Sequence, residues 1–233
     1  MKLSGEGHAV MSQKRHDEPR AKKMTKGISD LSEKVANISP VKRAFVLALV
    51  AVLSALLSTY ASWNATGQIG QVNGTPVQPG LYFGLVLSFG VFCWITRRKP
   101  DLFTVLAVTT VGWILAHQTA YQMYEFIDGS GRLPPQVPYV LAMCGATGGL
   151  VGSFVTGAGI SLVSKGFYDG GNWARTILIG TITGTLLESA VDAGTAPRSL
   201  PVHVGGFLPL FLVWQCSVAA SIGYGLTARN DRD

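Results

Sequence analysis

Small and acidic residues recur at every fourth position of the stretch 176–192. Thr176, Gly180, Gly184, Glu188 and Asp192 share this spacing, so an α-helix places them along one face. The residues between them are largely apolar, which puts the two acids in or beside a membrane. A carboxylate that faces lipid is costly, and an intramembrane acid is therefore a candidate functional residue.

Further polar side chains fall inside apolar stretches of the sequence. They occupy the second half of the segment 102–124 and the middle of the segment 207–226. A carboxyl group beside a histidine could carry protons or coordinate a cation. We expect a polar cavity on the outer side of the membrane, formed by Glu188, Asp192, His117, Gln118, Tyr121 and Gln215.

Structural explanations of these residues stay open at this point. Asp192 lies close enough to the outer boundary to be simply hydrated, and Glu188 could make one structural hydrogen bond. His117 could serve as a hydrogen-bond donor between helices. The acids and His117 have no spacing diagnostic of a metal site, and no nucleophile–base pair is visible. We therefore predict no catalytic residue, metal or cofactor, and we consider an enzyme less favoured than a non-enzyme.

The composition favours a membrane protein with a basic N-terminal tail. The chain of 233 residues is 48% hydrophobic and only 14% charged, whereas soluble domains carry roughly 25% charged residues. Residues 1–27 are polar and basic, and we expect a disordered cytoplasmic tail that can attract anionic lipid. The tail has no aromatic residue to stack on bases, which argues against nucleic-acid binding. A short amphipathic interfacial helix is expected over 28–40.

Six apolar segments are long enough to be membrane spans. About 20 apolar residues cross a bilayer as a helix. The predicted spans form a domain over 41–228 and cover 44–62, 81–96, 102–124, 137–164, 176–192 and 207–226. The fold class expected is an all-α integral membrane protein with six transmembrane helices. The three cysteines, Cys93, Cys144 and Cys216, fall inside these spans and imply no disulfide framework.

Charge predicts the orientation of these spans. With both termini in the cytoplasm, the only Lys or Arg in the outer loops are Arg132 and Arg198. The other basic residues, including those of the C-terminal segment 229–233, fall on the cytoplasmic side, as the positive-inside rule requires. The expected location is a membrane crossed several times, with the bacterial inner membrane as the preferred one.

Small residues also predict how two of the spans pack. Small side chains four residues apart let membrane helices approach closely. The fourth span carries such a face, which we expect to pack against the fifth span: Gly145, Gly149, Ser153 and Gly157 against Gly180 and Gly184.

Two classes of function follow from these patterns. The first is a transporter or channel subunit for a small solute or cation, with its cavity around Glu188. The second is a non-transporting structural or assembly subunit, whose Gly and Ser faces bind helices of a partner protein or of a second copy. The bilayer is a partner in both.

Overall fold

Six helices and one small hairpin make up the described part of the protein. The computed structural model describes residues 38–63, 71–72, 74–129, 138–168, 170–192 and 202–226. The elements are α2 (Pro40–Trp63), β1 (Gln71–Val72), β2 (Thr75–Pro76), α3 (Gln78–Trp94), α4 (Lys99–Gly129), α5 (Pro138–Val163), the 3-10 turn η2 (Lys165–Phe167), α6 (Gly170–Asp192) and α7 (Val202–Gly225). The all-helical prediction is confirmed for these residues. The expected tail over 1–27, nearly all of the expected helix over 28–40, and 229–233 lie outside them.

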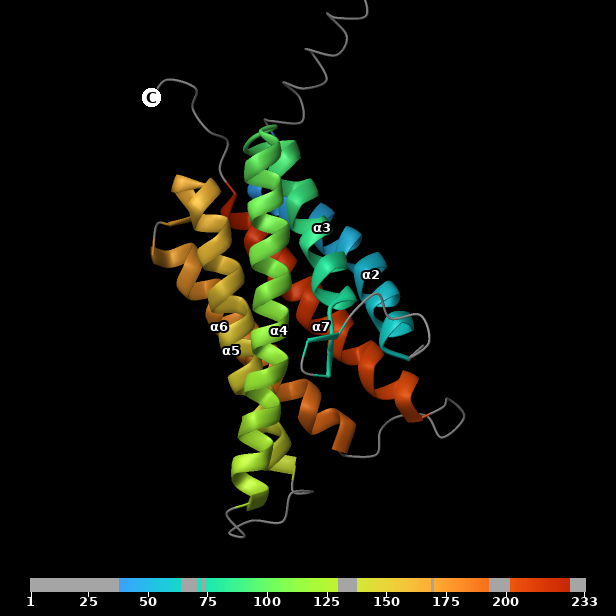
Figure 1. The fold of residues 1–233 in the computed structure, drawn as a ribbon. Coiled ribbons are helices and arrows are strands. Elements are labelled where there is room, and N and C mark those ends of the chain that lie inside the picture. The colour runs from blue at the N-terminus through green and yellow to red at the C-terminus, as the bar shows by residue number, and fades with distance from the viewer. Residues whose placement is uncertain are drawn as a thin grey trace, which may run out of the picture. The chain divides into compact units, whose positions relative to one another are not determined.

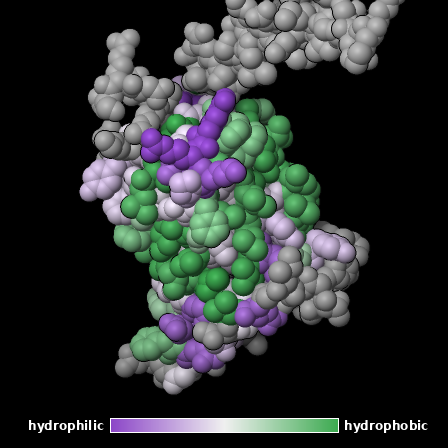
Figure 2. Space-filling model, turned by 45° about the horizontal axis from the view of Figure 1, so that its top comes forward, coloured by the Kyte–Doolittle hydropathy of each residue, from purple (hydrophilic) through white to green (hydrophobic). Residues whose placement is uncertain are grey.

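Four helices are long and apolar enough to cross a membrane. These segments are Pro40–Ala61, Lys99–Ile127, Tyr139–Val163 and Leu208–Gly225. Helix α3 is apolar but has 17 residues, and the side chains of α6 are described only as far as Thr185. In Figure 2, apolar side chains cover the middle of the visible face, and polar side chains gather at its two ends. This distribution is the one expected of a protein surrounded by lipid.

Four helices carry a proline in their first turn, where no backbone N–H donor is needed, whereas Pro209 lies inside α7. Pro40 opens α2 and Pro138 opens α5, while Pro79 lies in the first turn of α3. Pro100 follows the first residue of α4, so the helix starts three residues before the predicted span 102–124. Asp101 favours this start, because an acid in the first turn complements the helix dipole.

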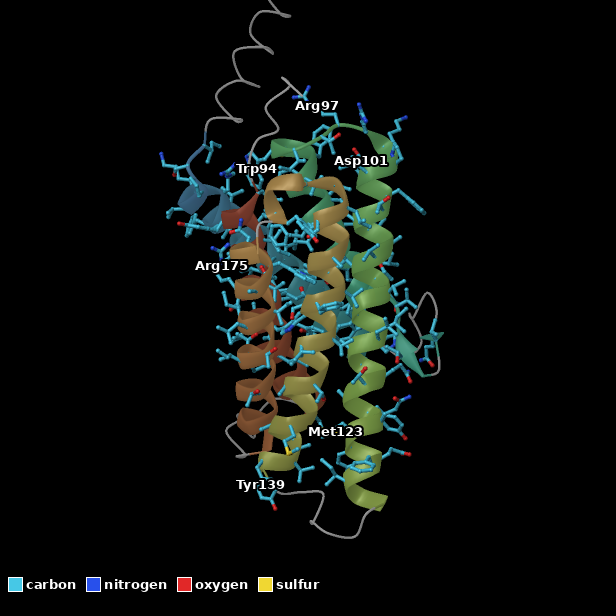
Figure 3. The ribbon with its side chains drawn as sticks, turned by 90° about the vertical axis from the view of Figure 1, so that its left-hand side faces the viewer. Trp94, Arg97, Asp101, Met123, Tyr139 and Arg175 are labelled. Atoms are coloured by element: carbon cyan, nitrogen blue, oxygen red, sulfur yellow. The ribbon has the colours of Figure 1, made fainter. Side chains whose placement is uncertain are left out.

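The helices form a ring in which neighbours in sequence are neighbours in space. Each helix from α2 to α7 packs against the next one, and α7 closes the ring by packing along α2 (Figure 1). Successive helices run in opposite directions. Accordingly, Arg97 and Asp101 lie at one end of the bundle and Met123 and Tyr139 at the other (Figure 3).

The closest packing in the ring is between α5 and α6, where backbone atoms of glycine residues lie in contact. A Cβ atom on Gly149 would collide with the carbonyl group of Gly180, and a Cβ atom on Gly184 would collide with the carbonyl group of Gly145. Ser153 completes this face, since its hydroxyl donates to the carbonyl of Gly149 at 2.6 Å and turns inward. The small residues of α5 thus meet another helix of the same chain.

Candidate functional site: an aromatic cavity beside a short hairpin

A tight hairpin interrupts the connection between α2 and α3. Gln71 pairs with Pro76 and Val72 pairs with Thr75, and Gly74 lies in the turn between the two strands. Gly74 has a φ of 80°, a backbone conformation that two-residue hairpins require and that favours glycine. The sequence analysis predicted the spans 44–62 and 81–96 and no element between them. The Asn-Gly pair was the signal that could have identified the hairpin.

The hairpin is held against α4 by polar side chains of that helix. The indole Nε1 of Trp113 donates to the carbonyl oxygen of Pro76 at 2.8 Å. The amide Nε2 of Gln118 donates to Oγ1 of Thr75 at 2.6 Å, and the same oxygen lies 3.0 Å from Nδ1 of His117. Polar residues of α4 therefore find their partners in the hairpin.

His117 shares a hydrogen bond with a buried threonine. Thr75 is fully buried, and its oxygen accepts the amide proton of Gln118 and lies 3.0 Å from Nδ1 of His117. A hydroxyl oxygen can accept two hydrogen bonds and donate one, so the contact is compatible with either tautomer of His117.

A cavity of about 90 Å³ lies between α4, α5, α6 and α7, next to His117. Its wall is formed by aromatic and small residues: Trp113, Ala116, His117, Ala120, Gly145, Gly148, Gly149, Gly184, Leu210, Phe211 and Trp214. The helices α4 and α7 are not neighbours in the ring and meet here through side chains. The rings of Trp113 and Phe211 lie 5.3 Å apart and are inclined by 49°. The cavity is thus the space left where α4 faces α7.

Trp214 is one of the buried aromatic residues of this wall. Only 7% of its surface is exposed, and its ring packs 5.4 Å from that of Phe83 on α3. The Cζ2 edge of the indole, next to the ring nitrogen, approaches Gly152 of α5. Its Nε1 is buried and has no hydrogen-bond partner among the residues that the structure describes. Because this N–H is shielded by its neighbours, Trp214 contributes its apolar ring to the wall.

The predicted polar residues do not gather around one cavity. His117 lines the cavity, whereas Gln118 is engaged by the hairpin. Tyr121 is 55% exposed and donates to the carboxylate of Glu125 on the surface of α4. Gln215 is buried and is not a lining residue of the cavity; its amide donates to the hydroxyl of Ser58 on α2 at 3.1 Å.

The structure describes the backbone of the two acidic residues of α6 but not their side chains. The backbone of α6 continues as a helix to Asp192, but the side chains of Glu188 and Asp192 are outside the described residues. Gly184 lines the cavity, and Glu188 follows it by one helical turn on the same face. Among the described side chains, no three His, Cys, Asp or Glu residues come together as possible metal ligands.

Sequence reasoning missed the aromatic wall. The sequence analysis did not single out Trp113, Phe211 and Trp214, which fall inside apolar spans. The spacing of Trp113 and His117, four residues apart on one helix face, was a weak signal. Nothing in the sequence indicated that α7 would face α4.

A second polar cluster lies at the opposite end of the bundle, where Arg175 joins α6 to α7. Its guanidinium donates to the carbonyl of Ser221 at 2.9 Å and to Oδ1 of Asn172 at 3.1 Å. It also lies 4.5 Å from the ring of Tyr224. Figure 3 places Arg175 toward the end of the bundle that carries Arg97. These contacts are structural, since they tie two helices together.

The comparisons with known proteins add no relative. No protein-family model, no curated protein sequence and no solved structure matches the chain. The function of the cavity must therefore be argued from its own geometry and chemistry.

Proposed function

We propose that this protein is a small-solute transporter or channel subunit that takes its solute into the cavity between α4, α5, α6 and α7. The observation that supports this proposal is the cavity itself, with His117, Trp113 and Trp214 in its wall. Binding sites in helical membrane proteins are commonly concave spaces between helices, with few polar groups among apolar ones. The cavity has this composition.

The proposed topology has six spans with both termini in the cytoplasm. It puts the hairpin and His117 in the outer half and the basic residues around Arg97 on the inner side. Described cations at that end include Lys42, Arg98 and Lys99, all exposed. Their position favours the cytoplasm under the positive-inside rule. A bacterial inner membrane is the proposed location.

The size of the cavity limits the solute. At about 90 Å³, it is smaller than the roughly 150 Å³ cavity that holds benzene in another protein. It can accommodate a few water molecules or one compact solute. Glu188, one turn beyond Gly184, is proposed to influence which solutes reach this cavity, because an acid in that position is unfavourable without a functional or structural partner.

The alternative of an assembly subunit has less support. That hypothesis needs the small-residue faces to receive helices from another chain. Gly149 and Gly184 meet α6 and α5 of the same chain, so this face has no room for a further helix. Exposed apolar residues elsewhere, such as Phe45 and Leu49 on α2, are explained by contact with lipid.

Solute entry into proteoliposomes tests the proposed function. Proteoliposomes are transferred into an isotonic solution of glycerol, acetamide or methylammonium chloride, and their swelling is followed. For at least one of these solutes, vesicles that contain the protein should swell faster than protein-free vesicles. Leu210→Trp replaces a leucine of the cavity wall by a larger indole ring, which should fill the cavity. The rate of swelling should then fall to that of protein-free vesicles. Val213→Trp, on the exposed side of α7, is the matched control and should swell like the wild type.

Two results would contradict the proposal. One is swelling at the protein-free rate with all three solutes. The other is equal swelling for Leu210→Trp and the wild type, which would mean that the cavity is not on the path of the solute.

A further inference from the structure

Arg43 is a buried arginine near the start of α2. Only 5% of its surface is exposed, and its Nε is buried without a hydrogen-bond partner. The structure records no hydrogen bond or ion pair of this side chain with any described residue. An arginine stays charged in a protein, and a buried charge without a partner is costly. Arg43 therefore lacks the anion that its burial calls for.

Arg43 lies at the end of the bundle where the exposed cations gather. A Cβ atom on Gly90 of α3 would lie 2.9 Å from Cδ1 of Leu47, which fixes the register of α2 against α3. Because the two helices run in opposite directions, Arg43 is level with Trp94, the last residue of α3. Figure 3 shows Trp94 and Arg97 at the same end of the bundle. An anion bound to Arg43 would thus lie at a membrane surface.

A groove of about 300 Å³ lies farther along the same two helices. Its described lining is mainly apolar, with Val50, Leu53 and Leu57 from α2 and Leu85, Val86 and Phe89 from α3. Leu53 is 59% exposed and Leu85 is 56% exposed. The groove is therefore open on the outside of the helix ring, where lipid is expected.

The depth of the groove matches that of a lipid chain. Arg43, Val50 and Leu57 are seven residues apart and lie on one face of α2. At 1.5 Å per residue, Val50 and Leu57 are about 10 Å and about 21 Å from Arg43 along the helix. The hydrocarbon of one leaflet is about 15 Å thick and lies beneath about 5–8 Å of headgroups. A lipid whose phosphate is level with Arg43 therefore places its acyl chain at the depth of the groove.

We infer that α2 and α3 bind one anionic phospholipid, with its phosphate paired to the guanidinium of Arg43 and an acyl chain in the groove. The planar fork of a guanidinium suits phosphate oxygens. The exposed side chains of Lys42 and Arg97 add positive charge nearby. A soluble phosphate would leave the groove empty, and an apolar helix of a second copy would leave Arg43 unpaired. The site lies apart from the solute cavity between α4, α5, α6 and α7.

Three probes test the ligand class. They are phosphatidylglycerol, phosphatidylcholine with the same acyl chains, and glycerol 3-phosphate, which is an anion without a chain. Native mass spectrometry of the full-length protein released from detergent micelles gives the dissociation constant of each. Phosphatidylglycerol should bind about fivefold more tightly than phosphatidylcholine, the effect of roughly one cation on an anionic lipid. Glycerol 3-phosphate should not bind at the same concentration.

A pair of arginine variants tests the headgroup contact. Arg43→Gln removes the charge, so phosphatidylglycerol should bind about fivefold more weakly and phosphatidylcholine as before. Arg98→Gln is the matched control, because it removes the same charge from an exposed side chain at that end. Its lipid affinities should equal those of the wild type.

A pair of valine variants tests the groove. Val50 and Val52 are both half-buried on α2, but only Val50 lines the groove. Val50→Phe should weaken the binding of both lipids and preserve the preference for phosphatidylglycerol, because the larger ring competes with the acyl chain. Val52→Phe should bind both lipids like the wild type.

Four results would overturn the inference. Equal affinity of the wild type for the two lipids, or equal losses in Arg43→Gln and Arg98→Gln, would remove the anionic headgroup from Arg43. Glycerol 3-phosphate bound as tightly as phosphatidylglycerol would assign Arg43 to a soluble phosphate. A lipid-free dimer that Val50→Phe abolishes would assign the groove to a second copy. If Arg43→Gln does not fold, the three probes on the wild type and the two valine variants still decide.

Discussion

The hydroxyl oxygen of Thr75 lies 3.0 Å from Nδ1 of His117, although 42 residues separate them in the sequence. Through this contact the hairpin between α2 and α3 reaches a residue of the cavity wall. Thr75 is fully buried, so the hydrogen bonds that join it to Gln118 and His117 are shielded from water. Shielded hydrogen bonds are expensive to break, because the groups left behind stay unsatisfied.

Removal of the Thr75 hydroxyl should therefore destabilise the protein. Thr75→Val keeps the shape of the side chain but leaves Gln118 and His117 without their shared partner. We expect the free energy of unfolding to fall by about 1–3 kcal/mol, measured by thermal or denaturant unfolding in detergent. Thr75→Ser retains the hydroxyl and should remain within about 0.5 kcal/mol of the wild type. Equal stability of all three proteins would show that the hydrogen-bond chain contributes nothing.

A second prediction concerns the close contact between the glycine residues of α5 and α6. A Cβ atom on Gly180 would lie 2.5 Å from Cβ of Ser153, so Gly180→Ala must push the helices apart. Overpacking of this kind costs about 1–3 kcal/mol. Gly171→Ala is the matched control in the same helix, because a Cβ there meets nothing within 4 Å. It should be neutral or slightly stabilising, since alanine favours helix over glycine.

Coupling between the two helices can be measured in the same series. Adding Ser153→Gly to Gly180→Ala removes the atom that the new methyl group strikes. The double variant should be more stable than the sum of the two single effects predicts, by at least about 0.5 kcal/mol. Strict additivity would mean that Gly180 does not face Ser153.

The sequence indicated the elements of this fold better than most of their contacts. Each predicted apolar segment overlaps one of the six helices of the described residues, because a helix satisfies its own backbone polar groups and needs only apolar side chains in a bilayer. The four-residue spacing of Gly145, Gly149 and Ser153 predicted a close-packing face. The matching spacing of Gly180 and Gly184 indicated which helix would pack there.

The candidate site was harder to predict because it depends on contacts that are distant in sequence. His117 could be singled out as a polar residue in an apolar span, but its partner Thr75 lies in a loop with no charged residue. Gln215 was placed with His117 because both are polar, yet it faces α2 and bonds to Ser58. Which face of α7 meets α4 is decided by the packing of the whole ring.

Arg175 supplies a prediction at the opposite end. Its guanidinium holds α6 to α7 through Ser221, which is buried, and through the ring of Tyr224. Arg175→Met keeps most of the side-chain length but removes these bonds, and the free energy of unfolding should fall by about 1–3 kcal/mol. Arg98→Met removes the same charge from an exposed side chain near that end and should change stability by less than about 0.5 kcal/mol. Comparable losses in both variants would point to a general effect of charge.

The proposed topology can be tested with single cysteines. Val72 is 44% exposed on the hairpin and Lys99 is exposed at the start of α4, and the two positions lie on opposite sides of the membrane in the six-span arrangement. Val72 is a better labelling site than Gly74, because a cysteine at φ 80° would be strained. The native Cys93, Cys144 and Cys216 are first replaced by alanine or serine. A membrane-impermeant maleimide added to intact cells should label Val72→Cys at once and Lys99→Cys only after permeabilisation. Labelling in the reverse order would show that the topology is the inverse of the proposed one, with the hairpin and the cavity on the cytoplasmic side.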